Sequence, residues 1–243
     1  MQTPDPVVPA ADVPDVPVIV LLASALLGPA PWEPVERELR SRGYDVIIAP
    51  PSDEADPVTP TDAALSYATA VPADRRVILV PHSNAGNFVA TLIDIRVVAC
   101  VVFVDAVIPV ESGIQPLAPP TLLDRVEPLV DDDGLLPVWT DWFDEEDIAR
   151  LFPDPATRFH IEAQQPQLPL KFLRGALRID PGWDTTPAGY LAFGSTYADD
   201  VARARSRGWP VIELDGRHLH MLVDPVGVTD AILELVSRTA PEP

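Results

Sequence analysis

The sequence predicts an α/β protein built on a doubly wound, mostly parallel sheet, with a helical cap inserted into that core. Apolar runs over residues 18–22, 77–80 and 97–104 show no polar alternation, which is typical of strands buried on both faces of a parallel sheet. Segments with helical spacing separate these runs, as in right-handed βαβ units. The 243 residues, 47% of them hydrophobic, suffice for a sizeable core.

The chain is expected to contain a leader, a core in two pieces and a cap between them. Residues 1–15 are rich in Pro, Ala and Asp, and we expect a poorly ordered leader there. Residues 16–108 and 187–239 are predicted to form the core. Residues 109–186, where prolines are frequent and helical patches are short, are predicted to form the cap.

The first half of the core is predicted to alternate strands with helices. A strand over residues 18–22 is followed by a helix over 33–42, which ends at Gly43 because glycine commonly follows a helix. A strand over 44–49 comes next, and Pro50 stops it.

Further along the chain, the same alternation continues through the cap to the end. A helix is predicted over 62–69, a strand from Val77, a helix over 84–95 and a strand over 97–105. Cap helices are predicted over 144–152, 157–163 and 168–177. The core then resumes with a strand over 189–194, a helix over 199–207, a strand over 209–214 and a terminal helix over 226–238.

The charge and composition argue against a nucleic-acid partner. The net charge is −20 with only 17 Lys and Arg, which argues against nucleic acid because phosphate backbones are bound through clustered basic residues. We interpret the acidity as a solubility feature. A small-molecule partner is expected, with no cofactor and no metal, and with the protein as a monomer or homodimer.

A cytoplasmic location is predicted from the same composition. Cys100 is the only cysteine, so no internal disulfide can form, and its apolar surroundings predict a buried core residue. The apolar segment 16–27 lacks the preceding Lys or Arg of a secretory signal. No apolar run is long enough to span a bilayer, so no membrane association is expected.

A serine lies where the strand from Val77 ends and a helix begins. The segment reads Pro81-His82-Ser83-Asn84-Ala85, and a strand, a tight turn with a polar nucleophile and a helix form a nucleophile elbow. Proline and alanine occupy the two positions where the G-x-S-x-G pattern has glycine. The turn must therefore tolerate a Cβ on both sides of the serine.

Three motifs together carry a resemblance to a known family: Pro81–Gly86, Val102–Ala106 and Gly216–Pro225. With these motifs, nearly the whole chain resembles the α/β-hydrolase superfamily, in particular its small bacterial members. The order of serine, acid and histidine agrees with that family. The resemblance implies the α/β-hydrolase fold with an inserted cap and a serine esterase activity.

The resemblance also implies the residues of a catalytic triad. Ser83 corresponds to the nucleophile, which needs a base to take its proton. His218 lies after the last strand, where the family places its base, and is preferred to His220. Asp105 ends an apolar strand at an alternative acid position of the family, where a charge needs a partner. Asp199 is the alternative acid.

Two other histidines are expected to be structural. His82 precedes the serine, so its side chain should point away from the direction of Ser83, and His160 belongs to the cap.

The remaining site residues follow from the family's oxyanion hole and from the cap. The backbone amides of Asn84 and Ala25 are expected to form the hole, with Leu26 as the next choice after Ala25. The Ser24 hydroxyl is expected to supplement or replace an amide. Ser24, Leu26 and His220 are also predicted to line the pocket.

Trp139 and Trp142 leave two interpretations open. Together they are either aromatic walls of a substrate pocket or aromatic residues that dock the cap on the core. On the first interpretation, both side chains contact the substrate.

The expected reaction is cleavage of an ester, thioester or lactone through an acyl-enzyme, with an apolar acyl substrate. Two alternatives remain. One is a lyase or cyclase of natural-product biosynthesis that uses the triad for acid/base chemistry, and the other is a non-catalytic ligand-binding member of the family.

Overall fold

The computed structural model describes residues 16–52 and 59–239, so the predicted leader lies outside the described residues. Its centre is a six-stranded sheet in the order β2-β1-β3-β4-β7-β8, in which every neighbouring pair is parallel. The strands are β1 (Val18–Leu22), β2 (Val46–Ala49), β3 (Val77–Ser83), β4 (Val98–Ala106), β7 (Ala188–Phe193) and β8 (Val211–Leu214). The predicted doubly wound parallel sheet is confirmed.

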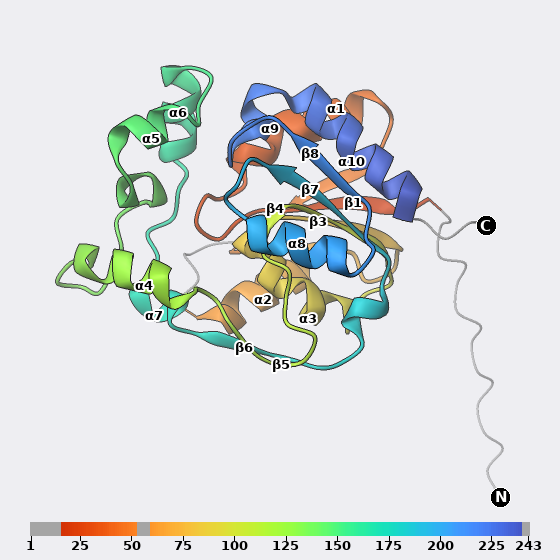
Figure 1. Cartoon of the computed structure of the whole chain (residues 1–243), viewed down its shortest axis with the longest axis horizontal. Helices are drawn as coiled ribbons and strands as arrows, with labels where there is room; N and C mark the ends of the chain where they lie inside the picture. Colours follow the sequence, from red (N-terminus) through yellow and green to blue (C-terminus); the bar gives the residue numbers. More distant parts are fainter. Residues whose placement is uncertain (1–15, 53–58, 240–243) are drawn as a thin grey trace, which may run out of the picture.

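Helices cover both faces of this sheet (Figure 1). The helices α1 (Glu33–Ser41) and α10 (Pro225–Thr239) lie on one face, and α2 (Pro60–Ala70) and α3 (Val89–Ile93) on the other. The helix α8 (Ala198–Ser206) packs beside β7 and β8. With both faces covered, β1, β3 and β7 are buried along their whole length, which explains the apolar run of β1 and that of β3 up to Pro81.

Local sequence signals fix several of these helices. Thr59 and Asp62 form a capping box at the start of α2, in which each side chain accepts from the backbone N–H of the other. In α1 the buried residues Val35 and Leu39 are four positions apart, as one helix face requires. The helix predicted over 84–95 is divided into the 3-10 turn η2 (Asn84–Phe88) and α3.

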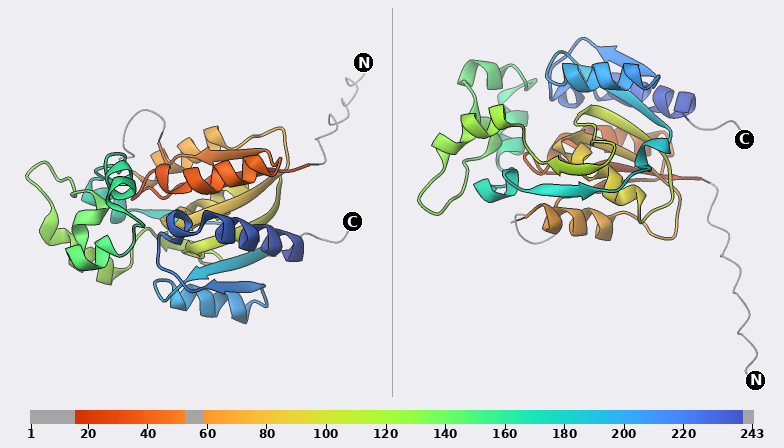
Figure 2. Two further views of the ribbon diagram at one scale, coloured as in Figure 1. Left: turned by 90° about the horizontal axis from the view of Figure 1, so that it is seen from above. Right: turned by 60° about the horizontal axis from the view of Figure 1, so that its bottom comes forward.

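The chain between β4 and β7 forms short helices and a separate two-stranded sheet. The helical pieces are α4 (Pro120–Val126), η3 (Glu127–Leu129), η4 (Trp139–Trp142), α5 (Glu145–Ala149), α6 (Pro155–Glu162), α7 (Leu170–Leu173) and η5 (Trp183–Thr185). Figure 2 shows α4, α5 and α6 grouped beyond one end of the main sheet in both views. The short elements η1 (Ala30–Trp32) and α9 (His220–Val223) complete the chain's described structure.

The two-stranded sheet was not expected from the sequence. β5 (Gly113–Pro116) pairs antiparallel with β6 (Ala176–Ile179), so the helix predicted over 168–177 is wrong at its end. Gly175 packs so closely on Pro60 that a Cβ there would lie 2.5 Å from the proline ring. Beyond it, Leu177 and Ile179 are buried and alternate with exposed neighbours, which is the period of a strand.

Candidate active site

Ser83 occupies a strained backbone conformation at the end of β3. Its φ is +57° and its ψ is −129°, a sparsely populated combination that costs about 1–3 kcal/mol. In the described part of the chain, the only other non-glycine residue with positive φ is Asp105, at +41° near the end of the neighbouring strand β4. Two strained polar residues therefore lie at adjacent carboxyl ends of the sheet, where ligands bind in such folds.

The glycine that this turn needs is one position later than in the G-x-S-x-G pattern. Pro81 and Ala85 are both buried, so the elbow accommodates a Cβ at each of these positions. At Gly86, by contrast, a Cβ would lie 1.9 Å from the carbonyl oxygen of Val107. Gly86 therefore allows η2 to pass close to the backbone that follows β4.

His218 and Asp105 form a buried hydrogen-bonded pair. Nδ1 of His218, from the loop after β8, lies 2.7 Å from Oδ2 of Asp105. The other carboxylate oxygen of Asp105 accepts from the Phe193 N–H at 3.2 Å. Because Nδ1 faces a carboxylate, it carries the proton, and Nε2 keeps the lone pair of a base.

His82 supports the loop that carries His218. Its Nε2 lies 3.0 Å from the backbone oxygen of His218, to which it donates, and the two imidazole rings stack with centroids 4.6 Å apart. Trp32 also packs edge-on against His82. Burial, reinforced by the nearby His218, lowers the pKa of His82 well below its usual value. His82 is therefore neutral at pH 7.

The hydroxyl of Ser83 has an unexpected partner. Its Oγ lies 3.2 Å from the hydroxyl of Tyr197, and among the described residues it makes no hydrogen bond to His218. Burial raises the pKa of Tyr197, so the phenol stays protonated. Tyr197 is not among the site residues predicted from the sequence, although it follows the carboxyl end of β7, at the edge where ligands bind in such sheets.

Asp199, the alternative acid, does not contact His218. Asp199 is exposed in the first turn of α8, a position that favours a negative charge whatever its function. Its neighbour Asp200 accepts from the Ile108 N–H at 2.9 Å and pairs with Arg203. The structure thus brings Asp105, rather than Asp199, into contact with His218.

The side chain of Asn84 is hydrogen bonded to one of the two backbone amides expected to form the oxyanion hole. The Ala25 N–H donates to Oδ1 of Asn84 at 2.9 Å, and so does the Ser24 hydroxyl, also at 2.9 Å. The Leu26 N–H donates in turn to the Ser24 Oγ at 3.2 Å. Nδ2 of Asn84 is buried without a partner among the described residues. A buried unsatisfied donor of this kind costs about 1–3 kcal/mol.

Two cavities meet at His218. One, of about 690 Å³, is bordered by Leu26, Tyr197 and His218, and the other, of about 540 Å³, by Phe143 and His218. Trp139 borders both, with its ring centroid 5.8 Å from that of His218. The cap therefore contributes aromatic walls directly beside the histidine.

The other predicted pocket residues lie apart from these two cavities. Trp142 is buried in the cap, where its Nε1 donates to the Pro137 oxygen at 2.8 Å. His220 packs edge-on against Phe193. Neither Trp142 nor His220 borders either cavity. Of the two tryptophans, Trp139 has the position of a pocket wall, whereas Trp142 is buried away from both cavities.

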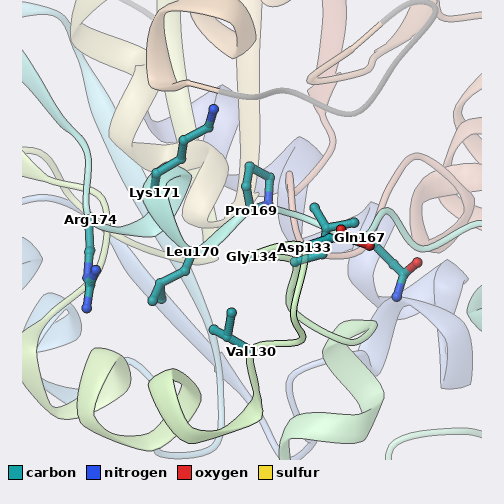
Figure 3. A pocket seen from close by; sticks show the side chains of 9 residues that line it. Val130, Asp133, Gly134, Gln167, Pro169, Leu170, Lys171 and Arg174 are labelled. Carbon is teal, nitrogen blue, oxygen red and sulfur yellow. The ribbon is translucent and has the colours of Figure 1, made fainter.

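A third cavity, of about 660 Å³, lies within the cap (Figure 3). Val130, Leu170, Lys171 and Arg174 are among its lining residues, and it shares none with the cavities at His218. Over residues 16–52 and 59–239, no group of three or more His, Cys, Asp or Glu side chains is arranged so that it could hold a metal ion. None of the helices in these ranges has the length and apolarity needed to cross a membrane.

Comparisons with known proteins find similarity in structure only. No protein-family model and no curated sequence matches the chain. An extracellular α/β-hydrolase from a Paenibacillus species has a TM-score of 0.70 at 18% identity, over 93% of this chain and 100% of that one. It is reported to share structural and functional homology with tobacco salicylic acid binding protein 2.

Two further solved structures have the same architecture. A pyrethroid hydrolase from Sphingobium faniae has a TM-score of 0.64 at 20% identity, over 91% of this chain and 97% of that one. A variant of tomato methylketone synthase I in complex with β-ketoheptanoate has a TM-score of 0.59 at 13% identity, over 92% of this chain and 98% of that one. By its sheet, its helical layers and these likenesses, the chain has the α/β-hydrolase fold.

Proposed function

We propose that this protein is a serine hydrolase that cleaves an ester, thioester or lactone through an acyl-enzyme. The observation that carries the proposal is the buried pair of His218 and Asp105, 2.7 Å apart, beside a serine on a strained turn. Strain at a polar residue and a carboxylate on Nδ1 of an imidazole are both features of nucleophilic catalysis. Asp105 is accordingly proposed as the triad's acid.

The proposed reaction begins when Ser83 Oγ exchanges its Tyr197 partner for Nε2 of His218. The oxygen attacks the carbonyl carbon while Nε2 takes the hydroxyl proton, and Asp105 stabilises the imidazolium. Collapse of the tetrahedral intermediate breaks the bond to the leaving group, which takes the proton from Nε2. Water then repeats the sequence on the acyl-enzyme and releases the acid.

An apolar acyl compound of small size is the proposed substrate. Leu26, Trp139 and Phe143 supply apolar walls next to His218, as ligand pockets commonly do. The pyrethroid hydrolase among the structural neighbours is in keeping with such a substrate. We propose no nucleic-acid or membrane partner, and a monomer or homodimer as the functional unit.

The experiment is turnover of short p-nitrophenyl esters by the full chain and by Ser83→Ala. We expect Ser83→Ala to lose hydrolysis down to the uncatalysed background. Ser237→Ala is the matched control, because Ser237 is exposed on α10. Turnover by Ser83→Ala at the wild-type rate would refute the proposal.

A lyase or cyclase is the second candidate, and one observation favours it. Ser83 is hydrogen bonded to Tyr197 rather than to His218, as a serine that serves as a polar contact would be. Methylketone synthase, one of the structural neighbours, is named for a product other than that of simple ester cleavage. Failure of a fluorophosphonate to modify Ser83 in the folded protein would favour this candidate.

The cytoplasm remains the proposed location. Cys100 is buried, and burial raises the pKa of its thiol, so this thiol would stay unreactive in a reducing or an oxidising compartment. The single cysteine thus does not distinguish the cytoplasm from an extracellular location. Location is therefore best tested directly, by fractionation of cells that express the full chain, with export to the medium as the contradicting result.

A further inference from the structure

The orientation of the Asn84 carboxamide is fixed by chemistry. The Ala25 N–H can only donate, so the Asn84 atom 2.9 Å from it must be the oxygen Oδ1. The Ser24 hydroxyl donates to the same oxygen. With Oδ1 held by two donors, Nδ2 necessarily faces the other way. The usual ambiguity between the two ends of an asparagine amide does not arise here.

The Asn84 side chain occupies one of the two backbone amides expected to form the oxyanion hole. The Ala25 N–H already donates to Oδ1 of Asn84, so of the two expected amides only the backbone N–H of Asn84 is left for an oxyanion. The same side chain carries an unused donor, because Nδ2 is buried and has no acceptor among the described residues. Asn84 is only 5% exposed and Ser83 beside it only 3%, so the two side chains are enclosed to a similar degree.

We propose that Asn84 provides the second oxyanion donor through Nδ2, in place of the Ala25 amide. This inference rests on the proposed hydrolase function. The acceptor that Nδ2 lacks is the carbonyl oxygen of the substrate, which becomes negatively charged when Ser83 attacks. Asn84 follows Ser83 directly, and its carboxamide is held against the Ala25 N–H, the other expected donor of the oxyanion hole. On this proposal, Nδ2 lies within reach of the carbonyl that Ser83 attacks.

In this proposal Ser24 and Ala25 orient the Asn84 side chain and do not donate to the oxyanion themselves. They hold the carboxamide through Oδ1, so that its Nδ2 is already oriented before substrate binds. Preorganised donors stabilise a developing charge because they need not reorient during the reaction. Ser24 is a positioning residue, since it acts on the substrate only through Asn84.

The test compares the wild type with Asn84→Ala in two assays. The first is the second-order rate at which a fluorophosphonate modifies Ser83, where the phosphoryl oxygen occupies the oxyanion site. The second is hydrolysis of a matched pair of activated esters, one with a carbonyl oxygen and one with sulfur in its place. Sulfur accepts hydrogen bonds weakly, so a hole that donates strongly prefers the oxygen ester.

For Asn84→Ala we expect kcat on the oxygen ester to fall by about 10²–10³-fold with KM little changed, as for loss of one oxyanion donor. The preference for oxygen over sulfur should fall with it, and labelling of Ser83 should slow. Asn84→Asp, which keeps the shape and loses the donor, should show the same loss of preference. Unchanged kcat and unchanged oxygen preference would overturn the inference.

A double-mutant cycle examines Ser24. We expect Ser24→Ala to lower kcat several-fold alone and to have no further effect in Asn84→Ala, because neighbours that act through one another are not additive. Thr239→Val is the matched control: it removes a buried hydrogen bond in α10 next to the start of β7, at the opposite end of the sheet. It should leave the oxygen preference unchanged.

These outcomes separate the two proposals. If Ser83→Ala retains hydrolysis, the hydrolase proposal fails, and the role of Asn84 fails with it. If Ser83→Ala is inactive while Asn84→Ala keeps its rate and its oxygen preference, only the role of Asn84 fails.

Discussion

The hydroxyl oxygens of Ser83 and Tyr197 lie 3.2 Å apart, and this contact takes the place that a bond from Ser83 to His218 has in a resting serine hydrolase. Tyr197 stands at the start of α8, and its ring is tilted against that of His218 with centroids 5.7 Å apart. Ser83, His218 and Tyr197 therefore form one cluster. In the proposed reaction, the Ser83 hydroxyl must give up its hydrogen bond to Tyr197 before it attacks.

Removal of the Tyr197 hydroxyl should therefore speed acylation. A hydrogen bond of this kind contributes about 0.5–1.5 kcal/mol, so we expect Tyr197→Phe to raise kcat/KM on activated esters by about two- to tenfold. The ring remains and keeps its packing against His218. Stopped-flow measurement of the acylation burst checks this. A decrease of more than tenfold would show instead that the phenol takes part in the chemistry.

The identity of the acid can be tested with two matched substitutions. Asp105→Asn keeps the shape of the side chain but stabilises the wrong tautomer of His218, and we expect kcat to fall by about 10³–10⁴-fold. Asp199→Asn should change kcat by less than about twofold, because the exposed Asp199 does not contact His218. The reverse order of effects in steady-state assays would assign the acid to Asp199.

The buried His82 should make stability depend on pH. Its folded-state pKa is lowered from the usual 6.5, so below about pH 6.5 the unfolded chain binds a proton that the folded chain does not. Stability should then fall as pH decreases through 6.5, by at most about 1.4 kcal/mol per pH unit for this one group.

Denaturant unfolding between pH 5 and 8 measures this dependence. His82→Gln should lose part of the slope, whereas His160→Gln should keep it, because His160 is exposed. Equal slopes in the wild type and in His82→Gln would contradict the assignment.

Gly86 should be the glycine of the elbow that cannot be replaced. Gly86→Ala places a Cβ against the Val107 carbonyl, and backbone must move on one side or the other. We expect the free energy of unfolding to decrease by about 3 kcal/mol or more, with loss of the proposed esterase activity. Gly43→Ala is the control: no atom lies within 4 Å of its Cβ, and it should cost about 1 kcal/mol for its positive φ alone. Equal effects of the two substitutions in thermal unfolding would contradict this account.

The main sheet could be predicted because its signals are local. An unbroken apolar run such as residues 18–22 has few alternatives to a doubly covered strand, and the observed β1 has these same bounds. The β5–β6 pair was missed because four-residue strands far apart in the chain carry little periodic signal. Leu177 and Ile179 do alternate with exposed neighbours, but the helix predicted over 168–177 takes in Leu177 and so hides this alternation.

The candidate site was predictable only in part, for a similar reason. Ser83 and Asp105 end neighbouring strands, so their proximity follows from the order of the sheet. The roles of Tyr197 and of the Asn84 side chain depend on rotamers and on contacts across loops, such as the bond from Ala25 to Asn84. Nothing in the spacing of the sequence specifies such contacts.

The most direct test of the central claim, that Ser83 is an activated nucleophile, is intact-mass measurement after incubation with a fluorophosphonate, followed by peptide mapping. The account predicts a single adduct on Ser83, formed by loss of fluoride, that is absent from Ser83→Ala and forms far more slowly in His218→Ala. A folded wild-type protein that stays unlabelled, or a Ser83→Ala protein that is labelled as fast as the wild type, would contradict it.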